Sequence, residues 1–213
     1  DYVLLPLGKE QDFIQAAKRE VRARYPNWPR QDYCSIVNDK QFQRLSALIA
    51  DAEQKGAVVV KLIDAEDSER FMVPRIVLNA NDDMRLMQEE IFGPLLPVKS
   101  YRAIADVIQY INERPRPLAL YLFSEHEQEV EVVLRETHAG GVTLNDCLMH
   151  CAQSSLPFGG IGPSGMGVYH GKAGFETFSH LKPIFKQARI NGAKLMYPPY
   201  GMIARVLLRL LNR

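Results

Sequence analysis

Apolar runs of strand length alternate along this chain with stretches in which apolar residues recur every three or four positions. Residues 58–60 are consecutive valines, which is typical of a strand covered on both faces. Ile104, Val107, Ile108 and Ile111 follow the i, i+3, i+4, i+7 spacing of one helix face. Strands that alternate with helices of about ten or more residues form βα units around a mainly parallel, twisted sheet. The pattern therefore predicts the α/β class, with helices flanking the sheet.

The same two periodicities, together with a few single residues, indicate where the remaining helices and strands lie. Gly56 is positioned to end a helix, and Pro74 indicates that its strand is an edge strand or irregular. Asn145 and Asp146 follow the last predicted strand, at the sheet edge where such folds carry their chemistry. Strands are predicted at 2–5, 57–63, 72–78, 95–101, 118–123 and 141–144, and helices at 9–25, 39–55, from 104 until Pro115, and at 127–137.

Charge and cysteine content exclude several classes of protein. The 213 residues include 26 Lys and Arg against 25 Asp and Glu, so a net charge of +1 gives no attraction to nucleic acid or anionic membranes. No apolar run reaches the roughly 20 residues of a bilayer span, and no signal-peptide pattern opens the chain. Cys34, Cys147 and Cys151 are too few for a disulfide framework, which predicts a reducing, cytoplasmic setting.

A cluster of glycines runs from Gly159 to Gly167, and residues 160–165 satisfy the dinucleotide pattern G-x-G-x-x-G. That pattern requires a preceding strand, a following helix and an acidic residue about 20 positions further on. Here Leu-Pro-Phe precedes it, Pro163 lies inside it and no suitable acid follows. We interpret the cluster as a functional loop whose backbone turns sharply and approaches another part of the molecule closely.

Two acidic residues, Glu89 and Glu90, stand before Phe92 and a Gly-Pro turn at 93–94. Alone, this pair is typical of a solvated helix end that leads into a turn. A carboxylate can also accept two hydrogen bonds from a ribose diol, and an adjacent aromatic ring can pack on a flat heterocycle. The residues by themselves leave both interpretations open.

No metal site or nucleophile is predicted. Cys147 and Cys151 flank His150, but structural zinc needs four ligands and the chain has no second pair, so we expect apolar thiols near a strand end. Neither a Ser-His-Asp nor a Cys-His arrangement can be assigned. The other histidines lie in polar sequence surroundings with no shared spacing: His126, His138, His170 and His180.

The motifs at 88–94 (QEEIFGP) and 156–165 (LPFGGIGPSG) resemble the C-terminal half of NAD(P)-dependent aldehyde dehydrogenases. The resemblance runs from Asp1 to about Gln187. Further motifs are similar to the class-3-like branch, which includes bacterial coniferyl aldehyde dehydrogenases. They lie at 118–121 (LALY), 140–142 (GGV), 145–146 (ND), 164–172 (SGMGVYHGK) and 175–180 (FETFSH).

The resemblance implies that the full protein oxidises hydrophobic or aromatic aldehydes, such as coniferyl aldehyde, to carboxylic acids with NAD or NADP. It implies that Glu90 hydrogen-bonds the nicotinamide ribose and that Phe92 lies beside the nicotinamide. It also implies that Phe158, Gly159 and Gly160 line the substrate pocket.

The family pattern places the nucleophilic Cys, the general-base Glu, the oxyanion-binding Asn and the nucleotide domain before Asp1. No catalytic residue is therefore assigned in this chain, and we expect it to be a fragment that is inactive without the N-terminal half of its protein. A stand-alone, non-catalytic interaction module of the same fold is the alternative.

The resemblance divides the chain into a catalytic portion at 1–180, an oligomerisation strand at 181–190 and a tail at 191–213. The strand implies at least a homodimer, because in this family it joins the sheet of a neighbouring subunit. Within the tail, residues 202–213 have the pattern of a basic amphipathic helix. Docking on the chain's own body or on a partner subunit is favoured for it over the membrane contact of a fatty-aldehyde enzyme.

Overall fold

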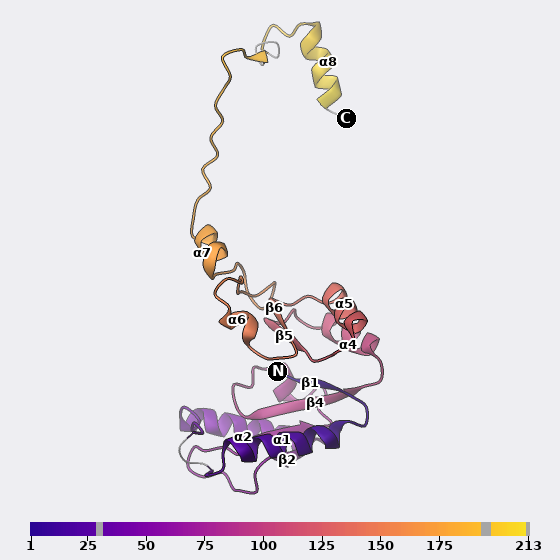
Figure 1. Ribbon diagram of the computed structural model, residues 1–213, viewed down its shortest axis with the longest axis vertical. Coiled ribbons are helices and arrows are strands. Elements are labelled where there is room, and N and C mark those ends of the chain that lie inside the picture. Colours follow the sequence, from indigo (N-terminus) through magenta and orange to yellow (C-terminus); the bar gives the residue numbers. More distant parts are fainter. Residues whose placement is uncertain (29–31, 193–196, 212–213) are drawn as a thin grey trace.

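The computed structural model describes residues 1–28, 32–192 and 197–211. Figure 1 shows a body of two lobes, from which an extended segment leads to a separate C-terminal helix. The first lobe contains β1 (Val3–Pro6), α1 (Glu10–Arg24), α2 (Asp39–Gln54), β2 (Val58–Lys61), β3 (Arg75–Leu78), α3 (Arg85–Gln88) and β4 (Leu95–Tyr101). The second contains α4 (Ile104–Asn112), β5 (Ala119–Leu122), α5 (Glu127–Glu136), β6 (Gly141–Leu144), α6 (Met149–Ala152) and α7 (Gly171–Thr177).

The first lobe is built on a four-stranded sheet of order β1-β4-β3-β2. β4 pairs in parallel with both neighbours, with Val3 opposite Val98 and Val77 opposite Pro97. β2 pairs antiparallel to β3 at the sheet edge, and Val58 is 50% exposed. Val59 packs against the core on the α2 side and Val60 against the core on the α1 side, so the predicted strand is covered on both faces there, although it lies at the edge of the sheet.

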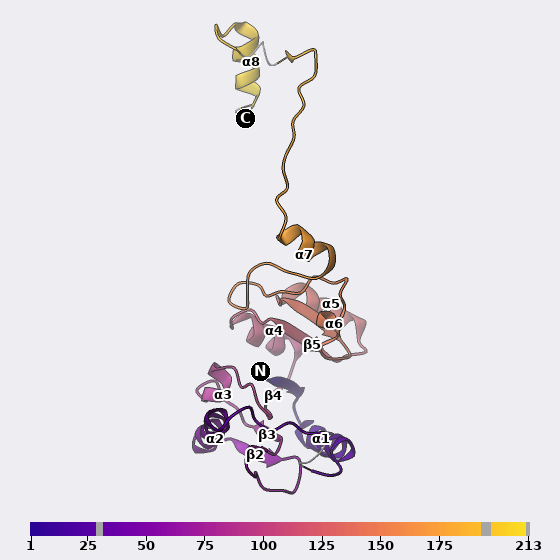
Figure 2. The ribbon, with the colours of Figure 1, turned by 90° about the vertical axis from the view of Figure 1, so that its left-hand side faces the viewer.

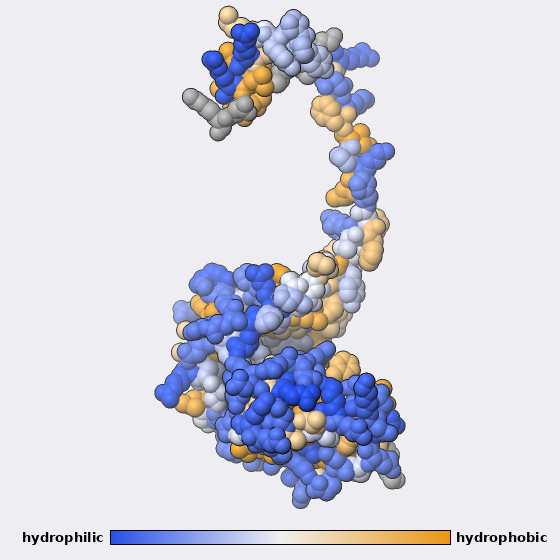
Figure 3. Space-filling model, turned by 180° about the vertical axis from the view of Figure 1, so that it is seen from behind, coloured by the Kyte–Doolittle hydropathy of each residue, from blue (hydrophilic) through white to orange (hydrophobic). Residues whose placement is uncertain are grey.

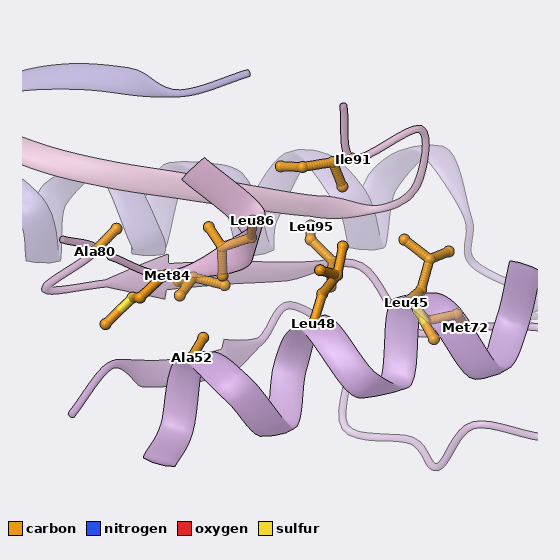
Figure 4. Close-up of a cluster of buried hydrophobic side chains, with 10 residues drawn as sticks. Leu45, Leu48, Ala52, Met72, Ala80, Met84, Leu86, Ile91 and Leu95 are labelled. Atoms are coloured by element: carbon orange, nitrogen blue, oxygen red, sulfur yellow. The ribbon is translucent and has the colours of Figure 1, made fainter. Parts of the chain in front are cut away.

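Neighbouring residues of β3 point to opposite faces of this sheet, so each face has its own core. Ile76 packs with Ile14 of α1, whereas Val77 packs with Leu45 and Leu48 of α2, and all of them are at most 3% exposed. Helices α1 and α2 thus cover opposite faces, as Figure 2 shows. Figure 4 shows the α2 side, where this helix, α3 and the following turn bury side chains together.

The second lobe holds a two-stranded parallel sheet of β5 and β6, with Ala119 opposite Gly141. The α/β class and the mainly parallel pairing are confirmed, but the strands form two sheets rather than one. Pro74 lies just before β3, in irregular backbone beside a central strand, so of the two predicted positions the irregular one is confirmed and the edge is wrong. Gly56 follows α2 with φ of +91°, as a terminating glycine should.

The C-terminal part leaves the body. Residues 181–188 are extended and exposed, and within the described residues they pair with no strand. α8 (Met202–Leu211) then lies away from the body in both views of the ribbon, so docking on the chain's own body is wrong. Figure 3 shows hydrophobic side chains along this segment and on α8, whereas the visible face of the body is mostly hydrophilic. No helix among the described residues is long and apolar enough to span a membrane.

Candidate functional site

Glu90 and Phe92 lie on the turn between α3 and β4. Both side chains face outward, and Phe92 is 81% exposed although its neighbour Ile91 is 1% exposed. Phe92 has φ of +47°, a left-handed conformation that an aromatic residue adopts only when its surroundings enforce it. Among the described residues, the Glu90 carboxylate has no hydrogen-bond partner. The turn therefore presents an unpaired carboxylate and an uncovered ring two positions apart.

The first residue of the chain lies beside this turn. Asp1 lies close enough to Glu90 for an electrostatic interaction between the two residues. Next to it, the Tyr2 ring meets the Tyr110 ring edge-to-face at 5.3 Å. The start of β1, the Glu90 turn and α4 thus meet in one region of the molecule.

Phe158 starts the glycine loop in the second lobe. Its backbone N–H and C=O bond to the C=O and N–H of Tyr169, both at 2.9 Å, which closes the loop into an antiparallel bridge. A Cβ on Gly159 would lie 2.2 Å from the carbonyl oxygen of Gly167, and one on Gly160 would lie 2.1 Å from that of Ser164. Gly162, Gly165 and Gly167 have positive φ values, which confirms the prediction of a sharply turning, closely packed loop.

A cluster of rings surrounds Phe158, and sequence reasoning missed it. His170 stacks on Phe158 at 5.8 Å with 23° between the ring planes, and Tyr169 meets Phe158 edge-to-face at 5.6 Å. On the other side, His150 lies 5.8 Å from Phe158 and 5.9 Å from Tyr121. The prediction of polar surroundings for His170 is wrong, because its Nδ1 is buried and has no hydrogen-bond partner among the described residues.

His150 is the buried member of this cluster, at 7% exposed. Its Nδ1 lies 2.9 Å from the hydroxyl of Thr143, which also accepts the His150 backbone N–H at 3.1 Å. Its ring occupies the space beside Gly141, where a Cβ would lie 2.4 Å from the His150 Cδ2. Gly141 in the GGV motif at 140–142 has no side chain, and this leaves room for the imidazole ring.

Asn145 and Asp146 do follow β6, as predicted. The Asn145 side chain accepts the Ser124 backbone N–H at 2.9 Å and donates to the Ser124 carbonyl at 3.2 Å, so it ties together the ends of β5 and β6. Asp146 accepts the backbone N–H of Cys147 at 2.7 Å. Cys147 is exposed rather than packed as an apolar thiol, and the described cysteines are free.

The structure does not join the two predicted groups directly. Within the part of the chain that the structure describes, no hydrogen bond or ring contact links Phe92 to Phe158. Two surface hollows, one bordered by Lys18 and Asp64 and the other by Arg116 and His138, contain neither group. Over residues 1–28, 32–192 and 197–211, no cluster of three or more His, Cys, Asp or Glu could hold a metal ion.

Comparison with known proteins identifies the family. Residues 9–184 match the aldehyde dehydrogenase family. A probable coniferyl aldehyde dehydrogenase of Pseudomonas aeruginosa is 49% identical over 202 residues, which are 94% of this chain and 42% of that protein. The rat "aldehyde dehydrogenase, dimeric NADP-preferring" is 38% identical over 93% of this chain and 44% of its own length.

The fold agrees with that match. A solved structure described as the substrate-bound state of Staphylococcus aureus AldH superposes with a TM-score of 0.83 at 39% identity, covering 100% of this chain and 46% of that one. The chain belongs to the aldehyde dehydrogenase family. Its relatives include proteins named as coniferyl aldehyde dehydrogenases, at 43–49% identity, and it spans less than half the length of the relatives named here.

Proposed function

We propose that this chain is the C-terminal part of the catalytic domain of an NAD(P)-dependent aldehyde dehydrogenase that oxidises hydrophobic or aromatic aldehydes, including coniferyl aldehyde. The observation that carries the proposal is the turn at 90–92. It holds an exposed carboxylate and an exposed aromatic ring outward on a conformationally restrained backbone. A protein that needed only a solvated helix end has no reason to hold Phe92 exposed with a positive φ.

The residues of this turn fit the nicotinamide end of NAD or NADP. The two oxygens of Glu90 can accept both hydroxyls of a ribose diol, and the Phe92 face can pack on a flat ring. When bound, the nicotinamide supplies the hydride acceptor of the family reaction. The role of these two side chains is to bind and orient that ring, and they neither attack the aldehyde nor move its proton.

Phe158, Gly159 and Gly160 form one wall of the proposed substrate pocket. The surrounding rings make the wall aromatic, which favours apolar and aromatic aldehydes over small polar ones. The names of the relatives support this class, since that of P. aeruginosa is a probable coniferyl aldehyde dehydrogenase and one from S. aureus is a 4,4'-diaponeurosporen-aldehyde dehydrogenase.

The chain needs two partners for this function. The nucleophilic Cys, the base and the nucleotide domain belong to the N-terminal half of the protein, so the chain alone should not oxidise aldehydes. Residues 181–190 are exposed throughout, and we propose that they form the oligomerisation strand of a homodimer at a partner's sheet edge. The name of the rat relative describes a dimer. Free thiols at Cys34, Cys147 and Cys151 support a reducing, cytoplasmic location.

Replacement of Glu90 by Gln in the full-length enzyme tests the role of the turn. Gln keeps the size of the side chain but loses the charge, so we expect hydride transfer to slow by about tenfold or more, with little change in the affinity for the adenosine half. Single-turnover formation of NADH or NADPH from benzaldehyde measures the step. Glu125→Gln, an exposed glutamate of the second lobe, is the matched control and should behave as wild type. An unchanged hydride-transfer rate in Glu90→Gln would refute the assignment.

A further inference from the structure

Arg44 of α2 holds the backbone of the Glu90 turn from the side away from solvent. Its guanidinium Nη1 donates to the carbonyl oxygen of Glu90 at 3.2 Å, and Nη2 donates to the carbonyl oxygen of Ile91. One planar guanidinium thereby binds two consecutive carbonyls. Its fixed fork of donors suits this geometry, in which separate nitrogen atoms reach separate acceptors.

The guanidinium is itself fixed. Nε donates to the Gln41 side chain at 2.7 Å, while the backbone N–H of Gln41 is capped by Asn38 at 2.9 Å. Nη1 also lies 3.5 Å from the Glu89 carboxylate, and the Arg44 side chain is only 23% exposed. Partial burial makes these charge-assisted bonds stronger than surface ones and removes the option of water as a substitute.

The turn is pressed onto the same helix. A Cβ on Gly93 would lie 2.5 Å from the Leu45 side chain, so only glycine allows this approach. Ile91 and Leu45 of α2 are buried in the same cluster, which Figure 4 shows, at 1% and 0% exposed. Apolar packing therefore holds the turn against α2, but apolar packing is not directional and does not fix the peptide planes of residues 90 and 91.

We propose that Arg44 is a positioning residue. Its two bonds set the peptide planes that aim Glu90 outward and keep Phe92 at positive φ. The inference rests on the proposed role of the turn in binding the nicotinamide ribose. The Glu90 carboxylate has no hydrogen-bond partner among the described residues, so its direction depends on the backbone below it.

The test compares Arg44→Met with Arg85→Met in the full-length enzyme. Arg85 also pairs with Glu89, at 2.9 Å, but its side chain reaches neither the Glu90 nor the Ile91 carbonyl, so it is the matched control. In Arg44→Met we expect single-turnover hydride transfer from benzaldehyde to fall about tenfold to a hundredfold. NAD⁺ affinity, from fluorescence quenching, should change less than about threefold, since the adenosine half binds elsewhere. Arg85→Met should stay within about twofold of wild type.

A second readout does not involve catalysis. Amide hydrogen exchange of the peptide at 88–96, in the enzyme without cofactor, should accelerate about tenfold in Arg44→Met and not in Arg85→Met. Arg44→Lys should restore little of either property, because one ammonium nitrogen cannot occupy the three positions that Nε, Nη1 and Nη2 fill. In a cycle with Glu90→Gln, the double variant should be no slower than the slower single variant.

The outcomes separate this inference from the proposed function. If Glu90→Gln slows hydride transfer while Arg44→Met leaves both transfer and exchange as in wild type, the positioning role is overturned and the function of the turn stands. If Arg44→Met accelerates exchange but Glu90→Gln leaves transfer unchanged, Arg44 restrains a turn that does not serve the nicotinamide, and both proposals about catalysis fail. An Arg44→Lys variant with wild-type hydride transfer and exchange would also overturn the proposal that the guanidinium fork positions the turn. This variant can still be measured if Arg44→Met does not fold.

Discussion

Gly141→Ala should disrupt the wall of the proposed substrate pocket by pushing out His150. The new Cβ would lie 2.4 Å from Cδ2 and 3.0 Å from Nε2 of the imidazole, far inside the 3.5–4.0 Å at which carbon atoms ordinarily meet. Overpacking costs about 1–3 kcal/mol, and the lost buried hydrogen bond to Thr143 costs about 1–3 kcal/mol more. A local destabilisation of about 3 kcal/mol follows, which corresponds to roughly 150-fold faster opening.

Native-state hydrogen exchange of the amides at 141–145 measures this opening in the full-length protein. His150→Ala removes the ring that the methyl group strikes, so the double variant should open no faster than His150→Ala alone. Gly192→Ala is the control, because its Cβ would meet no described atom within 4 Å. Exchange in Gly141→Ala within about threefold of wild type, or strictly additive effects in the double variant, would refute the steric reasoning.

Two further predictions concern charges. Asp67→Ala should destabilise the first lobe by about 3 kcal/mol, because it leaves the buried Arg75 guanidinium without the carboxylate that it contacts at 2.7 Å. Urea denaturation measures this loss. Lys9→Ala, which removes one partner of an exposed ion pair, is the control and should change the free energy of unfolding very little. For Asp82, burial raises the pKa of the carboxyl, but hydrogen bonds from Tyr110 and Arg114 outweigh burial and hold the pKa below its usual value. Its stabilising effect is thus present above the unfolded pKa of about 3.9 and lost as the pH falls through the lower folded pKa. The difference in melting temperature between wild type and Asp82→Asn should therefore shrink below about pH 4, and a pH-independent difference would contradict this assignment.

Much of the first lobe could be predicted because its helices and strands follow clear periodicities. Helix α2 buries Leu45, Leu48 and Ala52 at three- and four-residue spacing, and β4 matches the predicted range of 95–101. The helices α3 and α6 have only four residues each, too few for a periodicity to register. The valine run predicted a strand with both faces covered, but a β-branched sequence does not show whether that strand is central or at the edge of its sheet.

The site was predictable only in part, for a related reason. Sequence motifs pointed to Glu90, Phe92 and Phe158: Phe92 precedes a Gly-Pro turn, Phe158 stands between a proline and a glycine, and Glu90 lies two positions before Phe92. No sequence motif pointed to His150 or Arg44. His150 belongs to the site through a bond to Thr143 and the space above Gly141, and Arg44 through carbonyls 46 and 47 positions later in the chain. Contacts of this kind depend on tertiary packing, which local spacing does not encode.

The central claim is that this chain is the cofactor- and substrate-facing half of an aldehyde dehydrogenase whose nucleophile precedes it. The most direct test is to read the coding sequence immediately upstream of Asp1. We predict a Cys a few residues before Asp1 after a Gly-Gln-like turn, with a Glu and a Gly-rich strand–helix unit further upstream. An in-frame start codon at the boundary with no such Cys would contradict the claim and would leave a non-catalytic relative of the fold.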